Sequence, residues 1–207
     1  MKRLLFCLLS TCALSITVSA HVLDQYLQVA QIALAPDGVR IELRLIPGVQ
    51  VADRICTLID ADGDGQISAA EEQAYAQLVW RDLALEINGV RATLAPDGIQ
   101  FPSPPEMRKG LGTIRLTYSA AATLGAVGKH QLYFRNNHLP EFGVYLVNAL
   151  VPATSEIKIT GQERDPLQHG LQLNFQATPV ATPERRQWIG WFLFGLCLAL
   201  YFFTGRQ

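Results

Sequence analysis

Cysteine is scarce in this chain of 207 residues, and its four copies are poorly placed for disulfides. Cys7 and Cys12 lie in an apolar stretch at the N-terminus, and Cys197 lies in a second apolar stretch near the C-terminus. Cys56 is therefore the only cysteine in the segment between them. A disulfide framework is excluded as the means of holding this segment together, even in an oxidising compartment.

The sequence also lacks an excess of basic charge. Seventeen lysines and arginines face 18 aspartates and glutamates, which gives a formal net charge of −1 at pH 7. No long run of basic residues offsets this balance. We therefore expect no nucleic-acid partner, because such partners require a concentrated basic surface.

The motifs of common catalytic sites are absent as well. The chain has no G-x-S-x-G, no H-E-x-x-H, no C-x-x-C and no phosphate-binding glycine loop. His130, His138 and His169 are scattered along the sequence, and we expect them to be surface or hydrogen-bonded side chains. The sequence predicts a protein that is not an enzyme.

The N-terminal apolar stretch has the organisation of a secretory signal peptide over residues 1–20. Lys2 and Arg3 give it a basic start, an apolar segment follows, and small residues end it at Ser19 and Ala20. An uncleaved anchor is the alternative, although the apolar segment is shorter than the ~20 residues that a membrane span prefers. Cleavage after Ala20 would make His21 the first residue of the mature chain.

The C-terminal apolar stretch predicts a transmembrane helix over residues 188–205. Its uncharged part, 188–203, would be ~24 Å long as a helix, and Thr204 and Gly205 can extend it. A buried core helix or a helix in the membrane interface is the alternative. A stalk rich in proline and threonine at 179–187 would connect this span to the domain at 21–178.

Export of the N-terminus predicts a single-pass protein of the bacterial inner membrane whose domain faces the periplasm. Arg185 and Arg186 would then lie on the outer side of the membrane, against the usual distribution of positive charge. The charge distribution therefore does not itself favour this orientation.

The middle of the chain has the alternating pattern of β-strands. Residues 25–34 and 39–45 flank Pro36-Asp37-Gly38, and residues 83–87 and 90–94 flank Asn88-Gly89, so both pairs predict hairpins. The pentapeptide LAPDG at 34–38 recurs at 94–98, which predicts a second turn of the same kind. Further short strands are expected at 112–118, 131–135, 143–150, 156–161 and 170–176. The fold class predicted is mainly β, an antiparallel β-sandwich-like domain with a helix–loop–helix inserted at about 49–82.

The insertion contains the clearest motif, DADGDGQISAAE at residues 60–71. Its acidic spacing supplies oxygen ligands around one hard cation, and Gly65 permits the sharp turn between them. Calcium accepts such a crowded and flexible oxygen shell better than magnesium does. The expected ligands are the carboxylates of Asp60, Asp62, Asp64 and Glu71, the backbone carbonyl of Gln66, and Ser68 through a water.

The flanks of this loop predict two amphipathic helices. The entering helix would bury Val51, Ile55, Leu58 and Ile59, and the exiting helix would use Tyr75, Leu78, Val79 and Asp82. Ser68 and Glu71 also have the spacing of a capping box for the exiting helix. The simpler alternative is a solvated turn that binds no ion.

Over residues 60–71 the chain resembles the EF-hand calcium-binding family. That family usually pairs two such motifs, and this chain contains one. The resemblance therefore implies a structural calcium ion and not a calmodulin-like switch. It also implies the weak affinity of extracellular sites, a Kd on the order of 10⁻⁴–10⁻³ M.

A second resemblance depends on the start AHVLDQYL at 20–27, the strands after it and the aspartate-rich loop. Together these are similar to the periplasmic N-terminal regions of HupE/UreJ-type accessory proteins and nickel/cobalt permease-like membrane proteins. The resemblance implies an alternative function, an accessory protein for nickel, cobalt or copper uptake beside a separate membrane-protein partner. His21 would be the N-terminal metal ligand, with His138 or His130 as a second one.

Overall fold

The structure, a computed structural model, describes residues 25–178. These residues form ten strands and three helices. In chain order they are β1 (Tyr26–Ala35), β2 (Gly38–Pro47), α2 (Val49–Ile59), α3 (Ala69–Arg81), β3 (Leu83–Ile87), β4 (Val90–Arg91), β5 (Ala95–Gln100), α4 (Pro104–Arg108), β6 (Ile114–Ala121), β7 (Gly128–Asn136), β8 (Gly143–Ala149), β9 (Ile157–Arg164) and β10 (Gly170–Ala177).

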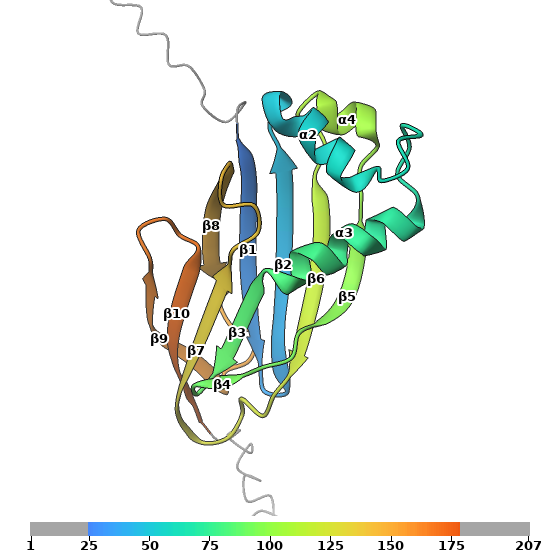
Figure 1. Ribbon diagram of the computed structural model, residues 1–207. Helices are drawn as coiled ribbons and strands as arrows, with labels where there is room; N and C mark the ends of the chain where they lie inside the picture. The colour runs from blue at the N-terminus through green and yellow to red at the C-terminus, as the bar shows by residue number, and fades with distance from the viewer. Residues whose placement is uncertain (1–24, 179–207) are drawn as a thin grey trace, which may run out of the picture.

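The strands form two five-stranded sheets that lie face to face, as Figure 1 shows. The first sheet has the order β5-β6-β2-β1-β8, and the second has the order β4-β3-β7-β10-β9. The domain is therefore mainly β and rich in antiparallel pairs, which is consistent with a β-sandwich. One described pair departs from the expectation, because β8 lies parallel to β1. The chain enters β8 from β7 of the other sheet, so this pairing needs no tight hairpin.

The predicted hairpin at the start of the domain is confirmed. β1 and β2 pair along their whole length, from Tyr26 opposite Pro47 to Ala35 opposite Gly38. In β1 every second residue up to Leu34 is buried, as the alternating sequence predicts for a strand with one face on a core. Burying a large aliphatic side chain such as Ile32 stabilises the fold by about 1.5–3 kcal/mol.

The second copy of LAPDG does not form the turn that its sequence predicts. At 34–38 the pentapeptide leads through the turn between β1 and β2, whereas Ala95–Gln100 is the edge strand β5 paired with β6. The register of that pair shifts between Pro96 and Gly98. A proline is tolerated there because an edge strand has one side without ladder bonds. Asp97 forms an ion pair with Arg40 of β2, a contact that depends on the tertiary fold.

Helices α2 and α3 confirm the predicted helix–loop–helix, with one change in the buried face. α2 buries Ala52, Ile55, Cys56 and Ile59. Leu58, expected in that face, is 43% exposed. The α2 face is thus rotated slightly from the one predicted, and Cys56 has no disulfide partner among the described residues.

α3 lies across the half of the first sheet that the second sheet leaves uncovered (Figure 1). It buries Tyr75, Ala76 and Val79, and the hydroxyl of Tyr118 in β6 donates to the backbone oxygen of Ala76 at 2.8 Å. The insertion is therefore part of the main core.

The domain has two distinct ends. The upper end carries the start of β1, helices α2 and α4, and the loop between α2 and α3 (Figure 1). The lower end carries the β1–β2 and β3–β4 turns, the β6–β7 and β8–β9 connections, and Thr178. Within residues 25–178 no helix is both long and apolar enough to cross a membrane. The predicted signal peptide at 1–20, His21, the stalk at 179–187 and the predicted span at 188–205 lie outside the described residues.

Candidate metal centre

Two glycines in the loop between α2 and α3 have left-handed backbone conformations. α2 ends where the Asp60 amide donates to the Cys56 carbonyl at 2.8 Å. Gly63 has φ of 76° and Gly65 has φ of 83°, values that glycine adopts without steric cost. The chain can therefore turn sharply twice within this short loop.

The aspartate side chains accept hydrogen bonds from backbone amides of the same loop. Asp60 accepts hydrogen bonds from the amides of Gly63 and Gly65, at 2.8 and 2.9 Å. Asp62 accepts from the Asp64 amide at 3.1 Å, and Asp64 accepts from the Gln66 amide at 2.7 Å. These bonds order the acidic loop through its own backbone.

Glu71 reaches across the loop from the first turn of α3. Its Oε1 accepts from the Ala61 amide at 2.7 Å, and its Oε2 accepts from both the amide and the hydroxyl of Ser68 at 2.9 Å. The predicted capping box of Ser68 and Glu71 is confirmed. Hydrogen bonds from Ser68, with smaller contributions from Ala61 and Asp62, hold the pKa of Glu71 below its usual value, so the carboxylate is charged near neutral pH.

Three of the predicted ligands converge. One carboxylate oxygen from each of Asp60, Asp62 and Glu71 lies within 4.8 Å of the others. Oxygens at such separations fit around a cation that binds ligands at ~2.3–2.6 Å. Asp64 is outside this group. Gln66 is exposed, and the Ser68 hydroxyl is occupied by Glu71.

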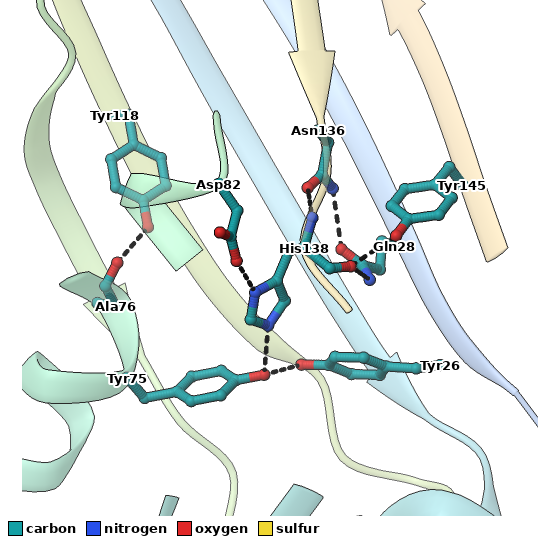
Figure 2. A network of polar contacts seen from close by, with 9 residues as sticks. All are labelled: Tyr26, Gln28, Tyr75, Ala76, Asp82, Tyr118, Asn136, His138 and Tyr145. Carbon is teal, nitrogen blue, oxygen red and sulfur yellow. Dashed lines mark hydrogen bonds and ion pairs between the residues drawn. The ribbon is translucent and has the colours of Figure 1, made fainter. Parts of the chain in front are cut away.

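The exiting helix is fixed at its far end by a buried polar network that Figure 2 shows. His138 is fully buried, and its Nδ1 lies 2.7 Å from Asp82, the residue that ends α3. Its Nε2 lies 3.0 Å from the hydroxyl of Tyr75, which lies 2.8 Å from that of Tyr26 in β1. The network joins α3 to the first sheet and to the segment after β7.

The hydrogen-bond partners of His138 determine which of its ring nitrogens carries the hydrogen. The carboxylate of Asp82 can only accept, so Nδ1 carries the hydrogen and Nε2 accepts from Tyr75. The Tyr75 oxygen then accepts from Tyr26. Burial lowers the pKa of His138, and it outweighs the attraction of Asp82 and Glu141, so the ring is neutral. Burial also raises the pKa of Tyr26 and Tyr75, which keeps both as donors.

The backbone carbonyl and amide of His138 also have hydrogen-bond partners. Its carbonyl accepts from Gln28 at 2.7 Å and from the Tyr145 hydroxyl at 2.6 Å. Its amide donates to Asn136, whose side chain donates to Gln28 at 2.9 Å. Nothing in the local sequence shows that this segment enters the core.

The ring nitrogens of His138 and His130 have hydrogen-bond partners within the fold. Both ring nitrogens of His138 are occupied, and the ring is shielded from solvent. His130 lies at the lower end, stacked on Phe175, with ring nitrogens 3.1 Å from Asn88 and 2.7 Å from the Ala126 carbonyl. The transition-metal alternative depends on His21, which lies outside the described residues, and it stays a prediction.

Comparison with protein-family models, with curated proteins and with solved structures yields no match for this chain. The chain's own residues define a mainly β domain that carries an ordered acidic loop between two core-packed helices.

Proposed function

We propose that the loop at 60–71 binds one calcium ion in the manner of an EF-hand. The observation that carries this function is the convergence of the Asp60, Asp62 and Glu71 carboxylates on one side of a loop turned by two glycines. Asp64 would join them by turning away from the Gln66 amide, Gln66 would add its backbone carbonyl, and Ser68 would bind through a water. Oxygen-only ligation favours calcium over softer metals.

The ion's role would be structural. The loop joins two helices whose inner faces lie in the core, through Ile59 on one side and Tyr75 on the other. Negative charges gathered in so small a loop repel one another, and a divalent cation relieves that repulsion. At calcium a hundredfold above Kd, binding would stabilise the folded domain by ~2.7 kcal/mol.

We infer further that this domain is an exported module tethered to the bacterial inner membrane. The sequence of residues 1–20 supports export, and the uncharged run at 188–203 supports a C-terminal span. The β-sandwich-like domain would then bind its calcium on the periplasmic side.

Titration calorimetry on a purified segment covering 21–178 tests the calcium site. We expect one ion per chain for the unmodified segment and a strong loss of affinity for Asp62→Asn, which keeps the side-chain shape and removes a ligand charge. Glu71→Gln should have the same effect.

The chain offers a matched control at a second capping box, Ser103 with Glu106, which has the same geometry and a lowered Glu106 pKa. Glu106→Gln should leave calcium affinity unchanged. The proposal is wrong if no heat appears up to about 10 mM calcium, above the weakest class of such sites, or if the two glutamine variants behave alike.

A further inference from the structure

The lower end of the domain exposes large aliphatic side chains from several separate connections. Val90 follows the β3–β4 turn, Val127 precedes β7, and Leu150 and Val151 follow β8. Their exposed fractions are 69%, 69%, 42% and 91%. All four lie in connections at the lower end of the domain, and exposed apolar side chains gathered at one end fit contact with another phase or molecule.

Val151 stands between two open, mainly apolar hollows. One, of about 530 Å³, lies along the β8–β9 connection and includes Ile157. The other, of about 590 Å³, lies beside the β1–β2 turn and includes Leu34. The two hollows can therefore accept aliphatic chains on both sides of Val151.

Charge at this end is mixed. Lys129 and Lys158 are exposed near the valines, and Asp37 and the partly exposed Glu156 are at the same end. Arg40 is already paired with Asp97. Apolar contact is therefore the main attraction that this surface offers, and salt should change it little.

The position of the last described residue, Thr178, indicates what the lower end of the domain contacts. The Thr178 amide donates to the Glu156 carbonyl at 2.8 Å, which fixes the last described residue beside the β8–β9 connection. Nine residues, 179–187, separate it from the predicted span, and even fully extended they cover only about 30 Å. The lower end is thus the part of the domain that the membrane would face.

We propose that the lower face, formed by Val90, Val127, Leu150 and Val151, rests in the headgroup boundary of the lipid bilayer. The two hollows beside Val151 would receive lipid chain segments, in the way that apolar side chains of peripheral proteins enter this boundary. The inference depends on the proposed tether and is independent of the calcium site.

Lipid-borne quenching of single labels tests this contact. The full chain is reconstituted into phosphatidylcholine vesicles, in a background where the cysteines of the terminal apolar runs are replaced by serine and Cys56 remains buried. An environment-sensitive fluorophore is attached through Val127→Cys or Val151→Cys. Matched control labels are attached through Leu111→Cys, after α4, or Leu167→Cys, between β9 and β10; these leucines are exposed by 78% and 72% and lie in connections away from the lower end.

We expect the Val127 and Val151 labels to lose quenching by aqueous iodide and to gain quenching by nitroxide-bearing lipid, at low and high salt alike. The control labels should remain open to iodide. Iodide quenching at Val151 equal to that at Leu111, in chains that float with the vesicles, would overturn the proposal and point to a protein partner or none. Chains that fail to float with the vesicles would refute the tether and, with it, this inference. They would not bear on calcium binding, which the titration calorimetry tests separately.

Discussion

Replacing His138 with leucine would remove the residue at the centre of the buried network. Leucine occupies a similar volume, so the cost comes mainly from hydrogen bonds and not from a cavity. Tyr75 loses one partner but keeps Tyr26, and the Asp82 side chain, 36% exposed, can turn to water. Two lost bonds, one of them to a charged group, amount to about 2–4 kcal/mol. For a domain of this size the melting temperature should fall by about 5–15 °C.

The same variant should change how stability depends on pH. Burial places the folded-state pKa of His138 below that of the unfolded chain, so the unfolded state binds more protons as the pH falls. The neutral ring's contribution is present above about pH 6.5, the unfolded value, and is lost on acidification toward the folded-state pKa. His138→Leu should therefore lose stability less steeply below that pH than the unmodified protein.

Urea unfolding followed by tyrosine and tryptophan fluorescence at several pH values measures both effects. His169→Leu is the matched control, because the His169 Nδ1 is buried without a hydrogen-bond partner among the described residues. It should leave stability near that of the unmodified protein. Equal midpoints for the His138 variant and the unmodified protein, or identical pH slopes, would refute the assigned hydrogen bonds.

Two further variants test backbone and packing. Gly65→Ala should destabilise the loop by about 1–2 kcal/mol and weaken calcium binding, because a φ of 83° strains a residue with a side chain. The added carbon itself has room, since no atom lies within 4 Å of it. Gly98→Ala, at a glycine with an ordinary φ, is the control in urea unfolding. Phe134→Ala should cost about 3–5 kcal/mol by leaving a cavity, whereas the exposed Leu111→Ala should fall within about 0.5 kcal/mol, and a comparable loss for both in thermal unfolding would contradict the burial described.

The loop could be predicted from the sequence because its determinants are local. The turns at Gly63 and Gly65, the aspartate bonds to amides at most five residues away, and the capping box all lie within twelve consecutive residues. The β1–β2 hairpin is similar, since a short turn joins strands that pair in full.

The remaining features depend on distant partners. The two copies of LAPDG differ because the second lies beside β6, a strand that its own sequence does not specify. The burial of His138 requires Asp82 and Tyr75, which are 56 and 63 residues away. Alternating hydrophobicity also predicts strands without saying which are neighbours, so the parallel pair of β1 and β8 was not foreseen.

The opposite placement of the acidic loop and Thr178 determines which solution the loop would sample. β2 runs the length of the domain with ten residues, or about 33 Å, from the lower end to the helices at the upper end. Counter-ions gathered by anionic lipids fade within a Debye length of ~8 Å at physiological ionic strength. An anchored domain would therefore hold its loop beyond that ionic layer, and its occupancy would follow the free calcium of the surrounding fluid, not the lipid composition beneath it.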